Sequence, residues 1–298
     1  MTENVIAQRR NNGKAKARSA ASKALSYAFL ILTAVVVLFP FYIALVTSFK
    51  TRVEAMNVEF TWWPKEFSLH GYKDVLTYKG SNAITIPLIV LGFLNTLWMV
   101  VPRSLISTVL AGMAAYAYAK LRFRAKNGMF GFLIATMMIP GVITLIPSYL
   151  MFYWLGWLTT PLPVILPPLL GGASCVFFMR QYYLGVPGEM VEAACLDGLG
   201  YFGIYFKIMF PIGMPAFWAQ LVLALIGGYN EYLGPLLYLK NTNLYTLQLM
   251  LTQFSSSRST DSAAVMASAM VALIPTVLVF VFAQKQFISG IVASGLKM

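Results

Sequence analysis

The chain has 298 residues, of which 59% are hydrophobic and only 11% are charged. Soluble globular domains carry about 25% charged residues, so this composition excludes a soluble protein of this size. The formal net charge is +12, but the basic residues stand in short blocks between apolar runs. That placement favours a membrane protein over a protein that binds nucleic acid.

Six apolar segments are long enough to cross a membrane as helices, which takes roughly 20 residues each. They predict an all-α integral membrane protein with spans at 25–47, 86–119, 128–152, 163–183, 212–238 and 264–284. Residues 1–24 form a basic tail, and residues 25–298 form one membrane domain. The first apolar segment is too long for a cleavable signal peptide, and no small-residue cleavage site ends it.

The distribution of positive charge predicts the orientation. The tail carries six basic residues against one acid, and the loop 120–127 carries four basic residues and no acid. Segment 48–85 is nearly balanced, with five basic residues and four acids. Because cytoplasmic loops are enriched in Lys and Arg, we expect the N-terminus and loop 120–127 in the cytoplasm. Six spans then place the C-terminus and loop 184–211 on the same side.

Some segments depart from a regular pattern. Pro102 lies within the second span and predicts a kink or an extension outside the membrane. Prolines and the Gly171–Gly172 pair interrupt the fourth span, which predicts a broken or partly re-entrant helix. The aromatic cluster at 61–67 and the polar segment 241–262 are expected in outer loops, the second with a short strand or helix.

Loop 184–211 has the features of a short acidic helix. Pro187 suits the first turn of a helix, and Glu189 and Glu192 fall near its positive end. Gly198 is placed to end the helix in a left-handed turn. A second helical stretch is expected from Tyr201 to Phe210, ahead of the next span.

One face of the acidic helix is predicted to accept a close neighbour. Helical spacing puts four residues on this face: Met190, Ala193, Ala194 and Asp197. The two alanines at its centre allow another backbone to approach closely. A solvated helix without a partner is the alternative that this pattern leaves open.

The loop resembles the cytoplasmic signature of ABC importer permeases. Its residues at the signature positions are Glu192, Ala193, Ala194, Gly198, Ile208 and Pro211. Asp197, the stretch 230–251 and the C-terminal sequence FISGIVASGLKM resemble the carbohydrate-importer branch, specifically the smaller permease related to the maltose importer. The resemblance covers most of the chain from about residue 25. The chain departs from the pattern at Phe210, where Leu is usual, and at Gly200, where Ser or Thr commonly caps the second helix.

This resemblance implies a multi-pass subunit of the cell membrane whose loop is a coupling helix in a cleft of a cytosolic ATPase. It assigns contact with the ATPase to Glu189, Glu192, Ala193, Ala194, Asp197, Gly198, Ile208, Pro211, Gly295 and Lys297. The implied partners are a second homologous permease subunit, two copies of the ATPase and an extracytoplasmic solute-binding protein, with lipid around them and no nucleic acid.

The chain itself has no nucleotide site of the phosphate-loop type, because it contains no GxxxxGK[ST] sequence. It is therefore expected not to be an enzyme. We expect no catalytic residue, metal site or cofactor in this chain, with ATP and Mg bound by the partner ATPase.

Arg103 and Glu231 are ionisable residues inside predicted spans, where each costs about 2.5–3.5 kcal/mol unless it faces protein or water. With Asn230 they are candidates for a polar translocation path between helix bundles. The alternative is structural: an ion pair, an inter-helix hydrogen bond, or a side chain that reaches the interface.

The leading hypothesis is a permease subunit of an ABC importer for carbohydrate. An ion-coupled secondary transporter would need paired carboxylates within spans and repeated halves, and neither is evident. A membrane enzyme would need a cluster of His, Asp or Ser. The only histidine, His70, is expected in a surface loop. The sequence does not distinguish a sugar from a glycerol phosphate as the solute.

Overall fold

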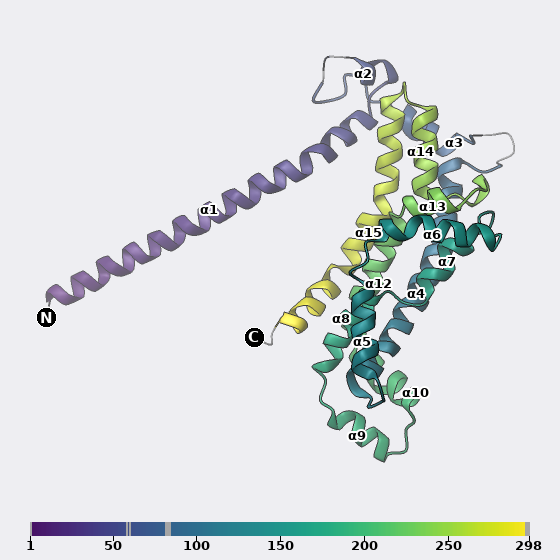
Figure 1. Ribbon diagram of the computed structural model, residues 1–298. Coiled ribbons are helices and arrows are strands. Elements are labelled where there is room, and N and C mark those ends of the chain that lie inside the picture. Colours follow the sequence, from purple (N-terminus) through teal and green to yellow (C-terminus); the bar gives the residue numbers. More distant parts are fainter. Residues whose placement is uncertain (1, 58, 60, 81–84, 296–298) are drawn as a thin grey trace.

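The computed structural model describes residues 2–57, 59, 61–80 and 85–295, and every regular element within them is a helix. Figure 1 shows an elongated bundle with α2, α3 and α14 toward one end and α9 and α10 at the other. The helical architecture agrees with the predicted all-α class.

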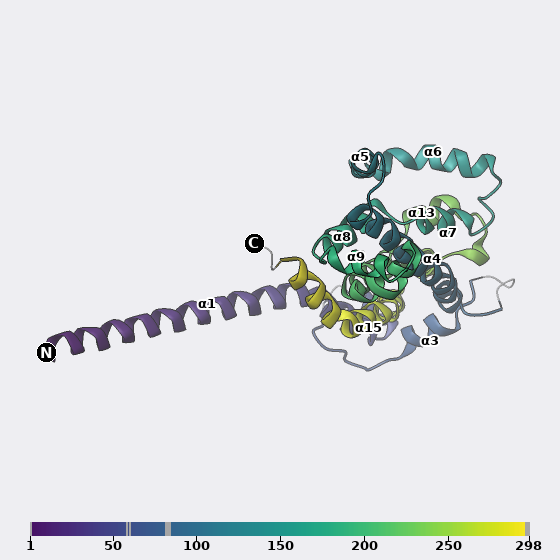
Figure 2. The ribbon, with the colours of Figure 1, turned by 90° about the horizontal axis from the view of Figure 1, so that it is seen from below.

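The first helix, α1 (Thr2–Ser48), extends away from the bundle over most of its length (Figures 1 and 2). Its apolar part, Ser22–Ser48, is long enough to cross a membrane, and only 6% of it is buried within this chain. The helix continues without a break through residues 24 and 25, where the sequence predicts the end of the tail. So little self-burial leaves the apolar surface of α1 to be covered by lipid or another subunit.

Two short helices follow: α2 (Arg52–Met56) and α3 (His70–Thr77). The loop between them carries Trp62 and Trp63, whose side chains are exposed. Glu54 anchors this loop, because its carboxylate accepts hydrogen bonds from the Thr61 hydroxyl and the Lys65 backbone amide. This anchoring gives the aromatic segment a fixed shape.

The central element is α4 (Leu88–Lys120), a helix of 33 residues that contains Pro102. Its length is about 50 Å at 1.5 Å per residue, more than the roughly 30 Å of a bilayer core. The helix continues through Pro102, and at this length it extends beyond the hydrocarbon core of a bilayer. Many of its side chains are buried, among them Met99, Arg103 and Ala111.

The predicted span at 128–152 corresponds to a bent pair of helices. Two helices, α5 (Lys126–Thr136) and α6 (Gly141–Trp154), occupy this segment and meet at an angle of 94°. Pro140 lies at the break, and a residue before proline is disfavoured in a helical conformation. Figure 2 shows both helices along one side of the bundle, opposite α3 and α15.

The fourth span is interrupted, as predicted. Helix α7 (Leu162–Leu169) ends before Gly171, and α8 (Ala173–Leu184) begins after Gly172. Gly171 has a φ of +82°, a conformation that glycine adopts without steric cost. The two helices together still form a candidate span, Leu162–Leu184.

The segment 184–211 and the residue after it contain α9 (Glu189–Leu196), α10 (Tyr201–Ile204), the π-helical turn η1 (Tyr205–Met209) and α11 (Phe210–Ile212). The chain then bends by 81° into α12 (Met214–Tyr229). The predicted span 212–238 is therefore too long, because it ends at Tyr229 and α13 (Leu233–Tyr238) is a separate helix.

The segment 241–262 contains a 3-10 turn, η2 (Thr242–Leu244), and α14 (Leu247–Ser257). Of the two alternatives predicted there, the helix is confirmed. Met250 and Phe254 of α14 are fully buried in a core that also contains Leu88 and Ala267. The last helix, α15 (Ser262–Gly295), contains the candidate span Ser262–Gln284 and packs against α1, α3 and α12.

Four helices in the described part of the chain are long and apolar enough to cross a membrane, or up to six if each bent pair is one span. The six predicted segments thus correspond to four helical spans and two bent pairs. One apolar core, containing Met179 and Tyr205, lies toward the α9 end, and a second, containing Leu88 and Phe254, lies toward the α14 end.

Candidate functional site

The acidic helix α9 ends as its sequence predicts. Gly198 has a φ of +80°, and its backbone amide donates to the Cys195 carbonyl while the Leu199 amide donates to the Ala194 carbonyl. This pair of bonds is the Schellman arrangement, which satisfies the last carbonyls of a helix. A left-handed glycine therefore sets the direction in which the chain leaves α9.

The start of α9 differs slightly from the prediction. Gly188 is the N-cap, and Pro187 precedes the helix instead of lying in its first turn. Glu189 and Glu192 do lie in the first turn, where their negative charges interact favourably with the positive end of the helix dipole.

The predicted shared face of α9 is divided by the fold. Ala194 is 3% exposed and packs with Val191 into the core of this chain, whereas Ala193 and Asp197 are exposed. Only Ala193 of the two alanines is therefore available to a neighbour. The periodicity identified the face, but the packing of α9 on its own chain decides which part of it stays free.

The return segment after α9 is helical from Tyr201, and Gly200 precedes it without a side-chain cap. Ile204, Tyr205 and Met209 are buried, and Ile208 is half-buried against the same core. Pro211 is exposed and lies within α11. The predicted stretch to Phe210 is therefore confirmed as helical, with a π-helical turn in it.

Hydrogen bonds connect this region to α4. The Tyr205 hydroxyl donates to the Val109 carbonyl at 3.1 Å, and Lys120 Nζ donates to the Val186 carbonyl at 2.5 Å. A side chain at Gly112 would meet the Tyr205 hydroxyl at 2.6 Å, so glycine permits this close approach. The base of the loop is thus fixed to the central helix.

Five large apolar side chains are exposed in this region. Leu196 is 90% exposed, Phe202 69% and Tyr201 66%, with Phe206 and Met190 also exposed. Together these five side chains form what we call the loop-tip patch. Water around an apolar surface of this kind is unfavourable, and such patches mark interaction sites.

Arg103 and Glu231, the predicted ionisable residues of the spans, form an ion pair. Arg103 Nη2 lies 2.7 Å from Glu231 Oε2, and the side chains are 5% and 37% exposed. Arg103 also donates to the Val164 carbonyl on α7 at 2.5 Å. The structure therefore contains the ion pair that was the structural alternative to a translocation path, and this pair offsets the cost of the buried Arg103 charge.

Asn230 and Glu231 do not lie inside a span, contrary to the prediction. Asn230 is the C-cap of α12, and Glu231 follows in the connection to α13. The Asn230 side chain donates to the Ile226 carbonyl and accepts from Gln248 at 3.4 Å. Asn230 is exposed and the Glu231 side chain is 37% exposed, so both are open to solvent or solute, whereas Arg103 is buried.

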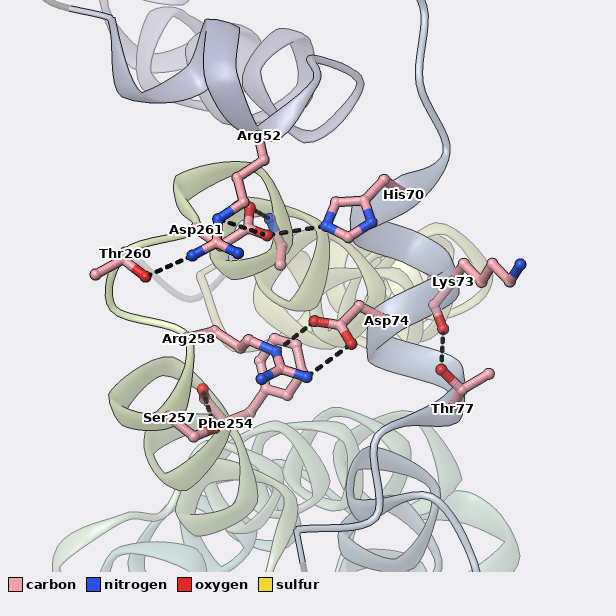
Figure 3. A network of polar contacts seen from close by, with 11 residues as sticks. Arg52, His70, Lys73, Asp74, Thr77, Phe254, Ser257, Arg258, Thr260 and Asp261 are labelled. Carbon is pink, nitrogen blue, oxygen red and sulfur yellow. Dashed lines mark hydrogen bonds and ion pairs between the residues drawn. The ribbon is translucent and has the colours of Figure 1, made fainter.

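A second polar network was not anticipated from the sequence (Figure 3). His70 is the first residue of α3, not a loop residue as expected, and its Nε2 lies 2.9 Å from Asp261 Oδ2. Asp261 is buried, accepts from the Ala264 amide at the start of α15, and lies 3.9 Å from Arg52. Beside it, Arg258 binds both carboxylate oxygens of Asp74. No local signal reveals these pairs, because their partners are far apart in sequence.

Gly295 and Lys297 are the two C-terminal residues predicted to contact the ATPase. Gly295 is the last residue of α15, and Lys297 lies outside the described residues. Over the part of the chain that is described, no group of three or more His, Cys, Asp or Glu side chains is arranged to hold a metal ion.

The chain belongs to the family of binding-protein-dependent transport system inner membrane components, whose model matches residues 107–292. It is therefore a permease subunit of an ABC transporter, and the comparisons do not favour the ion-coupled alternative. It is similar to the arabinooligosaccharides transport system permease protein AraQ of Halalkalibacterium halodurans, with 29% identity over 92% of this chain and 95% of that protein. It is also similar to the sn-glycerol-3-phosphate transport system permease protein UgpE of Rhizobium meliloti, with 29% identity over 91% and 96%.

The fold has a solved counterpart. A crystal structure of a bacterial ABC transporter involved in the import of the acidic polysaccharide alginate matches with a TM-score of 0.77 and 23% identity, over 88% of this chain and 95% of that one. This likeness shows that the arrangement of helices is that of an ABC transporter chain.

Proposed function

We propose that this permease takes up carbohydrate that an extracytoplasmic binding protein delivers, with ATP hydrolysis in a separate cytosolic ATPase. The similar proteins support this proposal, because their names specify arabinooligosaccharides and sn-glycerol 3-phosphate and the solved transporter imports alginate. All three are hydroxyl-rich solutes. The proposed partners are a second homologous permease subunit, two copies of the ATPase and the binding protein, within lipid.

The observation that carries the coupling mechanism is the loop-tip patch. Leu196 is 90% exposed at the end of a helix that its own chain leaves uncovered on one side. We assign this side to a cleft of the ATPase, with Ala193 allowing close approach and Glu189, Glu192 and Asp197 at the polar rim. Gly198 holds the turn that presents the patch, and Gly295 and Lys297 are assigned to a second contact from the C-terminus.

The loop is built to transmit a displacement. Val191 and Ala194 share a core with Met179 of α8 and Tyr205 of η1, and the Tyr205 hydroxyl is bonded to α4. Because packed cores move as units, a force on α9 reaches α4 and α8 directly. Ile208 and Pro211 continue this connection toward the bend before α12, so closure of the ATPase would change the angle between the bundles.

The orientation follows from charge. Loop 120–127 is basic, and it lies at the same end of the bundle as α9. Cytoplasmic loops are enriched in Lys and Arg, so this end faces the cytosol with both termini. ATP and Mg belong to the partner, and this chain supplies neither a catalytic group nor a cofactor.

For the translocation path we retain the group of Arg103, Asn230 and Glu231 as a proposal. The ion pair holds Glu231 at the end of α12, with 37% of its side chain exposed. A carboxylate held there is able to accept hydrogen bonds from a passing hydroxylated solute. Its pairing with Arg103 keeps the site close to neutral.

The natural thiol of Cys195 offers a direct test, because it is exposed on α9. A photoactivatable maleimide attached there should capture the ATPase subunit when the importer is assembled in inside-out membrane vesicles. Cys175, half-buried in α8, is the internal control, and Cys195→Ser should abolish the product. Capture of no ATPase, or modification of Cys195 by an impermeant reagent only from the extracytoplasmic side, would overturn the proposal.

A further inference from the structure

At the end of the molecule opposite the coupling loop, α14 borders a shallow, open recess of about 600 Å³ that has both polar and apolar lining residues. We call it the α14 groove. It is lined mainly by Tyr232, Gln248, Leu251, Thr252, Ser255 and Ser256. The other face of α14 is buried through Met250 and Phe254. The helix is therefore held firmly by its apolar side while its hydroxyl and amide groups face an open space.

The hydroxyl groups of the groove are oriented by the helix. Thr252 Oγ1 donates its proton to the Gln248 carbonyl at 3.0 Å, and Ser256 Oγ donates to the Thr252 carbonyl at 2.9 Å. Each hydroxyl has one proton and two lone pairs, so both oxygens remain as acceptors. The Gln248 amide nitrogen is directed toward Tyr229 and Asn230, which leaves its oxygen available too. The groove thus offers acceptors to a ligand rich in O–H donors.

Tyr232 adds a flat surface beside these acceptors. Its side chain is 39% exposed, and an aromatic ring combines an apolar face with a polar hydroxyl. A ligand that presents C–H groups on one side and O–H groups on the other would match this combination. Pyranose and furanose rings have this character.

The lining of the groove favours a neutral ligand over a charged one. No charged side chain is among the described residues that line it. Glu231, next to Tyr232, is paired with Arg103, and Arg258, next to α14, is held by both oxygens of Asp74. An anion such as a phosphate or a uronate would find no free cation among these groups, and desolvating it would be costly.

We propose that the α14 groove binds a neutral saccharide directly during transport, with Thr252 and Ser256 accepting hydrogen bonds from its hydroxyl groups and Tyr232 covering its ring. This proposal rests on the proposed function and restricts the transported solute to neutral saccharides. Among the solutes named for similar proteins, neutral oligosaccharides fit the groove, whereas sn-glycerol 3-phosphate and alginate do not. The chain would then contribute to specificity in addition to transmitting force.

A double variant in the complete importer tests the transport role. In proteoliposomes that contain both permeases, the ATPase and the binding protein, Thr252→Val with Ser256→Ala should lower uptake of radiolabelled neutral oligosaccharides about ten-fold, because each lost hydrogen bond weakens binding several-fold. Stimulation of ATP hydrolysis by the binding protein should be unchanged. Ser257→Ala is the matched control: this hydroxyl also bonds within α14, to the Phe254 carbonyl at 2.8 Å, but it does not line the groove.

Occupancy of the groove is measured separately, by protection of an introduced thiol. In the same importer with Cys175→Ser and Cys195→Ser, arabino- or maltooligosaccharides should slow alkylation of the thiol from Thr252→Cys and not of that from Ser257→Cys. We expect sn-glycerol 3-phosphate to protect neither position. Protection without ATP-driven uptake would contradict the proposed function and leave the groove as a saccharide site. The opposite outcome is that the double variant retains ATP-driven saccharide uptake and that no neutral oligosaccharide protects the thiol. It would overturn the proposal that the groove binds saccharide and leave the proposed importer function standing.

Discussion

Arg103 and Glu231 are 128 positions apart in sequence, and their side chains meet at 2.7 Å. The pair connects the middle of α4 to the residue that follows the C-cap of α12. The same guanidinium donates to the Val164 carbonyl of α7. One buried cation thereby joins three parts of the bundle at the point where α12 ends.

Removal of either charge alone should destabilise the protein. We expect Glu231→Gln to lower the free energy of unfolding by about 1–3 kcal/mol, because it leaves the buried charge of Arg103 unpaired. The loss should be smaller than for a fully buried pair, because Glu231 is partly exposed. Thermal unfolding in detergent measures this change. The double variant Arg103→Met with Glu231→Gln should recover part of the loss, because it also removes the buried charge.

Transport by the same variants separates the two interpretations of the pair. If Glu231 lies on the solute path, Glu231→Gln should reduce uptake by more than the loss of folded protein explains. Uptake per folded molecule equal to that of the unmodified protein would leave the pair a purely structural role.

Gly198 should be sensitive to substitution for a backbone reason. Its φ of +80° costs an L-amino acid about 1–2 kcal/mol, although a Cβ there would meet nothing within 4 Å. We expect Gly198→Val to redirect the chain after α9 and to uncouple ATP hydrolysis from uptake while the protein still inserts. Gly198→Asn should be milder, because Asn tolerates this region better.

The matched control for Gly198 is Gly188→Ala. Gly188 caps the start of the same helix with an ordinary φ of −67°, and a Cβ there also meets nothing within 4 Å. Uptake assayed with purified importer in proteoliposomes should be retained in this control. Equal uptake by Gly198→Val and the unmodified protein, at equal expression, would contradict the assigned role of the turn.

Local signals predicted much of the structure of loop 184–211. The acids of α9 and the glycine at its end act within one or two helical turns, so the sequence alone identifies them. The burial of Ala194 depends on contacts with other helices, which periodicity does not reveal. The pairs Arg103–Glu231 and His70–Asp261 join residues 128 and 191 positions apart, and no spacing rule connects such residues.

The same distinction holds for the spans. Hydropathy located all the apolar segments but not the 94° bend between α5 and α6. Pro140 marks where the helix breaks, yet the angle depends on how the two halves pack against neighbours. The end of α12 at Tyr229 is similar: hydropathy extended the span through Asn230 and Glu231, whereas Glu231 pairs with Arg103 and α13 is a separate helix.

Acid should loosen the loop between α2 and α3 through Glu54. Burial raises the pKa of this carboxyl, but hydrogen bonds from the Thr61 side chain and the backbone amides of Lys65 and Glu66, together with the charge of Lys50, lower the pKa overall below its ordinary value. A lowered pKa means that the carboxylate stabilises the fold above its unfolded pKa, and that this contribution is lost as pH falls through the folded value.

Limited proteolysis of the loop across this acidic range measures the effect. We expect cleavage near Trp62 and Trp63 to increase as the pH falls from about 4.3, the ordinary pKa of glutamate, through the lower pKa of Glu54 in the folded protein. In Glu54→Gln the loop should already be susceptible at neutral pH, and its cleavage should depend less on pH. Glu66→Gln is the control, because its exposed side chain can change without altering the backbone amide that stabilises Glu54.

Contact between α3 and α15 depends on Gly71, which follows His70 in α3. A Cβ on Gly71 would lie 2.8 Å from the Ala263 carbonyl oxygen and 3.1 Å from the Ala264 Cα. Both are backbone atoms, and Asp261 and Arg258 hold this region against α3, so neither side yields easily. Gly71→Ala should therefore lower the free energy of unfolding by about 1–3 kcal/mol.

The control is Gly131→Ala, in α5, where a Cβ would have open space around it. This variant should be neutral or should raise the free energy of unfolding by about 0.5–1 kcal/mol, because alanine favours helix. Thermal unfolding of the two variants in the same detergent tests this difference, and an equal melting temperature for both would refute the proposed close packing.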